Sequence, residues 1–289
     1  MRHAGAGGEE LLNAAAARGR FANIPRAEKG EPGMDFTLET LLLAGGLFAA
    51  MLALLEVGRR VGLRRMARDS EGARAGAGVV DGAVFALMGL LIAFTFSGAA
   101  SRFDERRKLI VEEANAIGTA FLRIDLLPPA AQADVRASFR RYLDARLAAY
   151  RALPDLVAAR AELARATGLQ QEIWAKTVAA SAGSQPATML LLPALNQMFD
   201  ITTTRTMAAE THPPPIIFGL LVAVAMLSAL LAGYAMAPAR GRNLMHMVLF
   251  AFTVAGAVYV ILDLEYPRLG MIRVSGFDHV LIELREGMK

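Results

Sequence analysis

The stretch LLIAFTFSGAASRFDERRKL, residues 90–109, joins an apolar segment directly to a charged one. Its first half is apolar enough for a lipid bilayer, whereas its second half carries Arg102, Asp104, Glu105, Arg106, Arg107 and Lys108. No proline separates the halves, and the single Gly98 costs a helix only about 1 kcal/mol relative to alanine. The first strong helix stop is Pro128-Pro129, because the residue before a proline is pushed out of the α region. The sequence therefore predicts one helix of about 79–126, of which only the first half lies in lipid.

The composition indicates a membrane protein. Of the 289 residues, 55% are hydrophobic, and the mean hydropathy of +0.38 is high for a soluble protein. The chain has no cysteine, which excludes disulfides, thiolate metal sites and cysteine nucleophiles. Its four histidines are scattered, whereas zinc needs three or four ligands that converge on one point. We therefore expect no metal site, no cofactor and no nucleic-acid partner.

Four stretches reach the roughly 20 apolar residues that a membrane-spanning helix needs: 36–57, 79–100, 216–237 and 244–264. Between the second and the third lies an insertion, residues 101–215, whose apolar side chains recur at helical spacing. Prolines and glycines divide it into helices of about 101–126, 130–152, 155–182 and 187–211, and no run indicates a strand. The predicted fold class is all-α: an integral membrane protein with four transmembrane helices and a long helical insertion between helices two and three.

These segments define five regions of the chain. They are a disordered N-terminal tail (1–33), membrane helices one and two (34–100), an extramembrane helical domain (101–215), membrane helices three and four (216–265) and a C-terminal segment (266–289). The tail is polar and rich in glycine and alanine, and we expect Met34, just before the first apolar run, to be the natural start. The C-terminal segment turns at Pro267 and Gly270, and we expect it to continue as a short strand or an interfacial helix that packs on the base of the insertion.

Basic residues in the short loops predict the orientation in the membrane. The loop 58–78 is rich in arginine, and the loop between helices three and four holds Arg240 and Arg242. Because short basic loops stay on the cytoplasmic side, we expect both loops in the cytoplasm and 101–215 in the periplasm of a bacterial inner membrane. Membrane lipids are expected partners, with headgroup contacts from Arg59, Arg60, Arg64 and Arg65.

One face of the long second helix suggests a pore. The face comprises Ala86, Leu90, Phe94, Ser97 and Ser101. A constriction of the apolar Leu90 and Phe94 side chains would gate ions by dewetting. The alternative is that both side chains face lipid or the bundle core, as most membrane leucines and phenylalanines do. Small residues on a neighbouring face, such as Gly82 and Gly89, favour close contact with another helix.

Ionisable residues inside membrane spans are candidates for function by default. The intramembrane or interfacial acidic residues here are Asp81, Asp263 and Glu265, with Glu56 near the end of the first span. All lie close to an interface, so we expect them to reach water or to pair with the arginines of 58–78. In the insertion, Glu112 and Glu113 have no evident partner, and no nucleophile motif or phosphate loop accompanies them. We therefore expect no enzyme activity.

The sequence resembles a known family in two places. Residues 90–118, LLIAFTFSGAASRFDERRKLIVEEANAIG, are similar to the stretch of bestrophin channels in which the pore-lining second helix leaves the membrane. Residues 262–275, LDLEYPRLGMIRVS, resemble the end of bacterial membrane proteins described as bestrophin-like, which the chain resembles over roughly residues 36–285.

The bestrophin resemblance implies a homopentamer with one axial anion pore, narrowed by the second helix at Ala86, Leu90 and Phe94. Two features of this sequence differ from that family. Thr95 and Phe96 stand where bestrophins carry an arginine and then a polar residue, so the anion-attracting charge is missing. Bestrophins also keep their insertion in the cytosol, whereas the loop charges here predict the opposite side.

Two functional classes therefore remain open. The first is an oligomeric ion channel whose pore is lined by the second helix. The alternative is a non-conducting membrane scaffold or sensor whose helical domain binds a partner. A third class, an enzyme, finds no supporting motif.

Overall fold

The computed structural model describes residues 36–68, 77–238 and 243–288, and within these ranges the chain is helical with no strand. The elements in chain order are α2 (Phe36–Met66), α3 (Ala77–Leu122), η1 (Arg123–Leu126), α4 (Pro129–Arg151), α5 (Leu156–Ser181), α6 (Gln185–Glu210), α7 (Pro215–Ala235), α8 (Leu244–Glu265), η2 (Ser275–Asp278) and α9 (His279–Gly287). The predicted all-α fold class is confirmed. The expected tail 1–33, the expected start at Met34, and Arg240 and Arg242 lie outside the described residues.

Four stretches of the described chain are long and apolar enough to cross a membrane: α2, the first part of α3, the α6–α7 stretch and α8. In the α6–α7 stretch, α7 supplies the apolar part. Each of these stretches overlaps one of the four predicted spans. The end of the first differs most from its prediction, because α2 continues to Met66 and so includes the beginning of the predicted loop 58–78. Arginine is a good helix former, so the basic residues at this end extend the helix instead of ending it.

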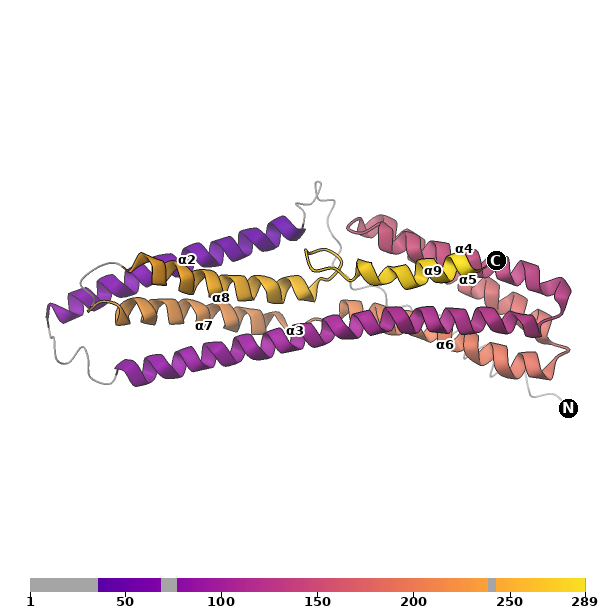
Figure 1. The fold of residues 1–289 in the computed structure, drawn as a ribbon, viewed down its shortest axis with the longest axis horizontal. Coiled ribbons are helices and arrows are strands. Elements are labelled where there is room, and N and C mark those ends of the chain that lie inside the picture. Colours follow the sequence, from indigo (N-terminus) through magenta and orange to yellow (C-terminus); the bar gives the residue numbers. More distant parts are fainter. Residues whose placement is uncertain (1–35, 69–76, 239–242, 289) are drawn as a thin grey trace, which may run out of the picture. The chain divides into compact units, whose positions relative to one another are not determined.

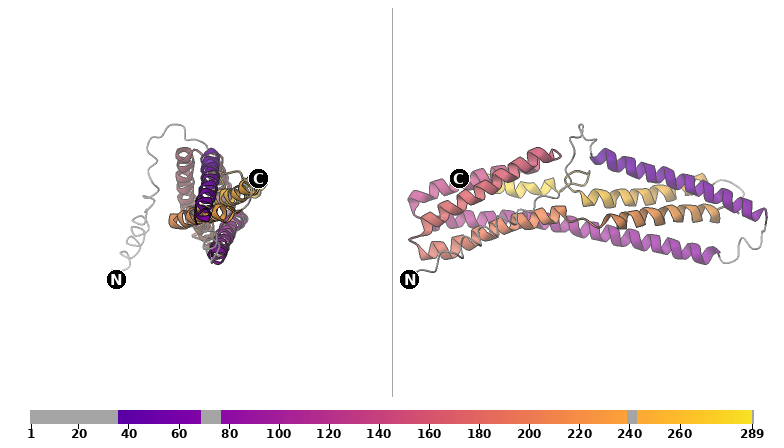
Figure 2. Two further views of the ribbon diagram at one scale, coloured as in Figure 1. Left: turned by 90° about the vertical axis from the view of Figure 1, so that its left-hand side faces the viewer. Right: turned by 180° about the vertical axis from the view of Figure 1, so that it is seen from behind.

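Helix α3 is the long helix predicted from residues 90–109. It runs without a break for 46 residues, or about 69 Å at 1.5 Å per residue. The 3-10 turn η1 and the extended Leu127 end it, and Pro128 and Pro129 then begin α4. Figure 1 shows α3 passing along α7 and α8 and then along α6, and the contacts between the elements agree. The same arrangement is visible from behind in Figure 2.

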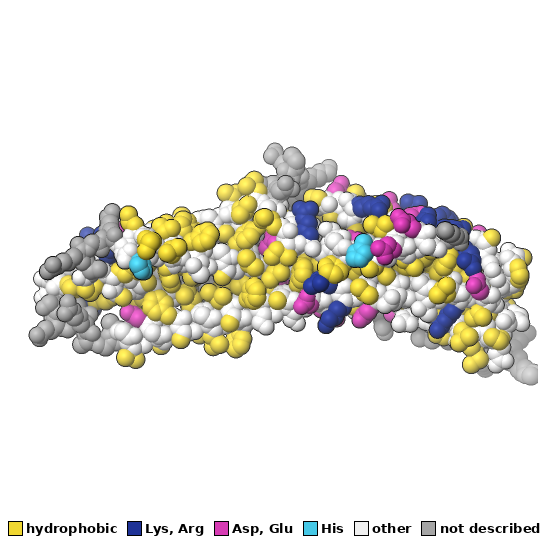
Figure 3. Space-filling model, in the orientation of Figure 1, with side chains coloured by type: hydrophobic (Ala, Val, Ile, Leu, Met, Phe, Trp, Pro, Cys, Tyr) yellow, Lys and Arg dark blue, Asp and Glu magenta, His cyan; other side chains and the backbone are white. Residues whose placement is uncertain are grey.

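Two hydrophobic cores are built on α3. The first joins it to α2, α7 and α8 and buries Met51, Leu55 and Ala225 completely. The second joins it to α4, α5, α6 and the C-terminal segment and buries Ile117 and Phe139 completely. In Figure 3, hydrophobic side chains cover the half with α2, α7 and α8, whereas charged side chains gather over the other half. The first half therefore has the surface of a membrane domain and the second that of a domain in water.

Glycines bring α2 and α7 into close contact. A Cβ added at Gly233 would overlap the carbonyl oxygen of Leu55, and one added at Gly58 would overlap the carbonyl oxygen of Leu230. The small-residue face predicted on α3 meets no other helix within the single chain. Apart from the neighbouring backbone of α3 itself, no described atom lies within 4 Å of a Cβ added at Gly82 or Gly89. The tight packing of the membrane half therefore uses α2 and α7, and these two glycines of α3 stay uncovered in the single chain.

The C-terminal segment packs on the extramembrane helices. It forms η2 and α9, so the expected strand alternative is wrong. Arg285 of α9 donates hydrogen bonds of 2.7 and 3.0 Å to the carboxylate of Asp144 on α4. Arg268, in the loop before η2, donates two hydrogen bonds of 2.9 Å to Asp278 and so holds that loop.

Replacing Gly233 with alanine should destabilise the membrane half, because the new methyl group would collide with the backbone of α2. Overpacking of this kind costs about 1–3 kcal/mol, so we expect a lower melting temperature of the detergent-purified protein by circular dichroism. Gly219→Ala on the same helix is the matched control, because no described atom lies within 4 Å of its Cβ position. Equal melting temperatures of the two variants would contradict the close contact.

Candidate functional site

The predicted pore residues share one exposed face of α3. Exposed on it are Ala86, Leu90, Phe94, Ser97 and Ser101. The fractional exposures of Leu90 and Phe94, 49% and 66%, are large for apolar side chains. On the opposite side of the helix, Met88 and Ala99 are buried in the core shared with α7 and α8. In a membrane, the exposed face must contact lipid, another subunit or a pore.

Beyond the membrane half, the same face of α3 becomes polar. Lys108, Glu112 and Asn115 are exposed at the spacing that continues the line of Leu90 and Phe94. Glu112 and Asn115 also line an open cavity of about 580 Å³ between α3 and α6, together with Asp200. The helix thus presents an apolar strip followed by a polar one.

Thr95 and Phe96, where the sequence departs from bestrophins, have ordinary roles in this helix. The Thr95 hydroxyl donates to the carbonyl oxygens of Leu91 and Ile92 at 2.7 and 3.1 Å, so its own helix satisfies it. The Phe96 side chain is 45% exposed. Neither residue supplies a charge to the face of Leu90 and Phe94.

Glu265, at the end of α8, is buried and paired with α3. Its side chain is 1% exposed, and Arg102 Nε donates to its two carboxylate oxygens at 3.0 and 3.1 Å. His212 Nδ1 lies 3.5 Å from the same carboxylate, and the His212 ring stacks on Tyr266. The expectation that Glu265 reaches water or pairs with the arginines of 58–78 is therefore wrong. A carboxylate as buried as that of Glu265 needs a nearby cation, and Arg102 of α3 is that cation.

Asp263 is also buried, and it binds backbone rather than arginine. Its carboxylate accepts hydrogen bonds from the N–H groups of Met271 and Ile272 at 2.9 and 2.6 Å. A Cβ added at Gly270 would overlap this carboxylate, so any larger residue there would displace the Asp263 side chain. The expected pairing with the arginines of 58–78 is wrong for Asp263 too, because the loop after α8 folds back over it.

The remaining residues predicted near the interface lie at the far end of the membrane half. Glu56 pairs with Arg59 at 3.0 Å and with Arg60 at 2.7 Å, within α2. Arg64 and Arg65 are exposed in the last turn of the same helix. Asp81, near the start of α3, is 8% exposed and therefore buried, so the expectation that it reaches water is wrong.

Glu113 carries a buried ion-pair network that was not predicted from the sequence. Its side chain is fully buried, Arg146 Nε donates to it at 2.7 Å, and Arg205 forms a second ion pair with it. The expectation that Glu113 has no partner is therefore wrong. The signal was present, because Glu113 lies on the side of α3 that buries Ile110 and Ile117, and a buried carboxylate requires cations.

Tyr150 organises the arginines of this network. The guanidinium carbons of Arg146, Arg205 and Arg268 lie 5.2, 4.6 and 4.3 Å from its ring centroid. Such cation–π contacts strengthen when they are removed from water. Burial raises the pKa of Tyr150, while the charges of Arg146 and Arg268 oppose the shift. The neutral ring thus joins α4, α6 and the loop after α8.

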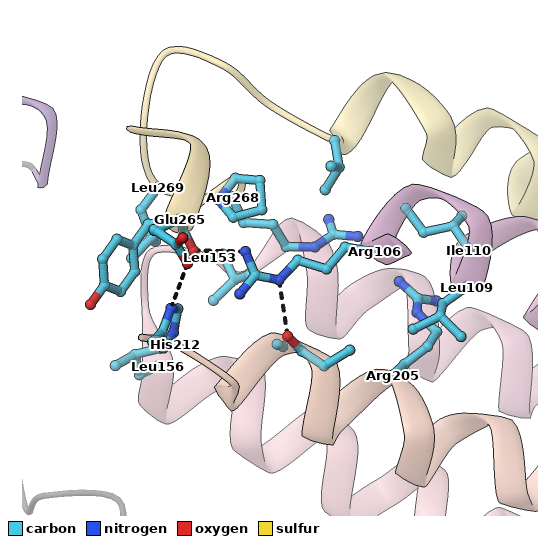
Figure 4. A pocket seen from close by; sticks show the side chains of 15 residues that line it. Arg106, Leu109, Ile110, Leu153, Leu156, Arg205, His212, Glu265, Arg268 and Leu269 are labelled. Carbon is cyan, nitrogen blue, oxygen red and sulfur yellow. Dashed lines mark hydrogen bonds and ion pairs between the residues drawn. The ribbon is translucent and has the colours of Figure 1, made fainter. Parts of the chain in front are cut away.

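A pocket with a volume of about 230 Å³ adjoins both clusters (Figure 4). Its polar edge holds Arg106, Arg205, His212, Glu265 and Arg268, and the remaining lining is mainly apolar. Within the described residues, no group of histidine, aspartate and glutamate side chains could hold a metal ion. The arrangement offers cations and apolar surface, which suits binding.

These features describe a multi-pass helical membrane protein in which one long helix connects the membrane half to a charged helical half. The model of the Bestrophin-like domain family matches residues 45–276, and the chain belongs to this family. No protein among those with curated descriptions matches it.

Solved structures show the same fold. Two are crystal structures of variants of a bacterial bestrophin homolog from Klebsiella pneumoniae. One is 14% identical, with a TM-score of 0.66 over 89% of this chain and 98% of that chain. The other is 15% identical, with a TM-score of 0.58 over 82% and 98%. A third, described as a membrane protein, is 16% identical, with a TM-score of 0.50 over 83% and 98%. At these identities the likeness concerns the fold.

Replacing Glu113 with glutamine should strongly destabilise the protein, because Arg146 and Arg205 would lose their shared counter-charge. Removing one partner of a buried ion pair costs about 3–5 kcal/mol. We expect a large fall in the melting temperature of the detergent-purified protein, whereas the adjacent and exposed Glu112→Gln should melt like wild type. A Glu113→Gln variant as stable as Glu112→Gln would show that the network does not hold the fold.

Proposed function

We propose that the protein is an oligomeric ion channel whose pore is lined by α3 of each subunit. The observation that carries this proposal is the continuous exposed face of α3, apolar at Ala86, Leu90 and Phe94 and polar from Ser97 onward. The family supports a membrane protein of the bestrophin kind.

The pore requires several copies of the chain. Each chain supplies one α3, so a closed ring of subunits is needed to surround an axis. The bestrophin resemblance favours a ring of five. Around such an axis, Leu90 and Phe94 would form an apolar constriction that controls ion passage by dewetting. The polar side chains of Ser101, Lys108 and Glu112 would keep the wider part of the pathway wet.

Reconstituted in planar bilayers, the protein should conduct ions, and Phe94→Ala should raise the single-channel conductance by widening the constriction. Phe96→Ala is the matched control, because Phe96 is also exposed but lies on another side of α3. We expect conductance close to wild type for this control. Silence of the wild type under varied salt, voltage and pH, or equal effects of the two variants, would reject the pore.

The orientation forms part of the same proposal. We place the short loops in the cytoplasm and the extramembrane domain in the periplasm, with Arg59, Arg60, Arg64 and Arg65 near anionic headgroups. The supporting observation is that Arg64 and Arg65 are exposed at the end of α2.

Because the chain has no cysteine, single introduced cysteines can report this orientation. On intact spheroplasts, a membrane-impermeant maleimide should label Val157→Cys, at a residue that is 80% exposed on α5. It should label Arg64→Cys only after lysis, which serves as the control for integrity. The reverse pattern would place the extramembrane domain in the cytoplasm.

A second candidate function is a non-conducting scaffold or sensor. The observation that favours it is the exposure of Leu122 and Met189, 71% and 65%, at the end of the extramembrane domain away from the membrane half. Apolar side chains gathered there would suit a protein partner. A protein that is silent in bilayers and is a monomer or two-fold dimer in detergent would favour this candidate over the channel.

A further inference from the structure

The pocket of Figure 4 lies where four parts of the chain meet. They are α3, the end of α6 with the linker to α7, the turn between α4 and α5, and the end of α8 with the loop that follows. Its apolar walls come from Leu109, Ile110, Leu153, Leu156, Leu269 and Val274. Because α7 begins and α8 ends beside it, the pocket lies at the boundary between the membrane half and the extramembrane half.

Arg106 brings a buried positive charge to this pocket. Its side chain is 7% exposed. Its Nε donates to the carbonyl oxygen of Ala208 at 2.9 Å, its Nη1 to that of Glu265 at 2.8 Å and its Nη2 to that of Thr211 at 3.0 Å. A guanidinium has five N–H donors, so these three bonds leave two donors without a partner among the described residues.

The carboxylates near Arg106 are already engaged by other groups. Glu265 pairs with Arg102 and contacts His212, Glu113 pairs with Arg146 and Arg205, Asp278 pairs with Arg268, and Asp263 binds two backbone N–H groups. Arg106 is therefore satisfied in part by carbonyl dipoles, but among the described residues it forms no ion pair. The Glu265 carboxylate attracts Arg106 but is also paired with Arg102, so two guanidinium groups share one carboxylate. A bound anion would supply a second negative charge and lower the cost of burying Arg106.

We propose that the pocket binds a small organic monocarboxylate, with the carboxylate on Arg106 and the apolar chain against Leu109, Leu156 and Val274. One further negative charge would balance the two guanidinium groups that share Glu265, and the two free donors of Arg106, which lines the pocket, suit a carboxylate. The apolar walls disfavour a hydrated inorganic anion. The volume of about 230 Å³ is small for a ligand site, so a short chain fits and a whole phospholipid does not. The site does not depend on whether α3 lines a pore.

Equilibrium dialysis of radiolabelled octanoate against the full-length protein in detergent tests the proposal. We expect saturable binding to wild type and at least about tenfold weaker binding to Arg106→Gln, because a charge-assisted pair is lost. Leu156→Trp should also weaken binding, since the larger side chain fills the pocket while Arg106 is kept. Arg165→Gln, on an exposed part of α5, is the matched control and should bind like wild type.

Two competitors define the chemistry of the site. Octylamine, which has the same chain with a cationic head, should not displace octanoate, and inorganic phosphate at matched ionic strength should displace it poorly. The proposal is overturned if wild type shows no saturable binding, if phosphate competes as well as unlabelled octanoate, or if Leu156→Trp binds like wild type. If Arg106→Gln does not fold, the Leu156→Trp variant still tests the binding proposal. Leu156 is 47% exposed, so we expect this variant to fold.

The carboxylate could come from water or from the membrane, and a further comparison distinguishes these sources. The protein is reconstituted in phosphatidylcholine vesicles with or without decanoate, a short fatty acid that partitions into bilayers, and octanoate binding is measured again. Displacement by vesicle decanoate supports a fatty acid that enters from the bilayer. Unchanged octanoate binding supports a water-soluble carboxylate.

Discussion

Helix α3 has to bury one side along its whole length while its surroundings change from lipid to water. In the membrane half, that buried side carries Met88 and Ala99, and in the other half it carries Ile110 and Ile117. The two cores therefore share one backbone without a hinge. The backbone of α3 stays the same where the surroundings change from lipid to water, and only the side chains differ. Apolar residues in the first half are replaced by paired charged residues immediately beyond Ser101.

The Arg102–Glu265 pair stands at this change of surroundings. It joins α3 to the end of α8, and the turn held by Asp263 follows directly. A buried pair of this kind adds little stability relative to an apolar pair, but it is costly to break and so fixes which groups face each other. The two halves of the molecule are thereby held in one register along α3.

The sequence was sufficient for the helices, because their determinants are local. The apolar runs, the absence of a stop before Pro128 and the proline and glycine breaks each act within a few residues, and the observed helices follow them closely. The exposed line of Ala86, Leu90 and Phe94 also followed from spacing alone. Whether this line faces a pore depends on neighbouring subunits, which no local pattern encodes.

The buried charges could not be assigned in the same way. The partners of Glu113 lie 33 and 92 residues away in the chain, and the partner of Glu265 lies 163 residues away. The number of arginines in the loop 58–78 suggested that they pair with the acidic residues of the membrane spans. In the folded chain, the buried carboxylates of Glu113 and Glu265 pair instead with arginines that are distant in the sequence. Extending the helical period past Ser101 would have placed Arg106 and Glu113 on the buried side of α3. This local pattern indicates that both residues need partners.

An uninterrupted helix acts as a lever. From Arg102 to Phe94 the distance along the axis is about 12 Å, at 1.5 Å per residue. A tilt of the extramembrane half by about 10° around Arg102 would therefore shift Phe94 sideways by about 2 Å, more than the length of a carbon–carbon bond. A tilt of the charged half would thus displace the exposed apolar strip directly through the backbone of α3, without an intervening loop or linker.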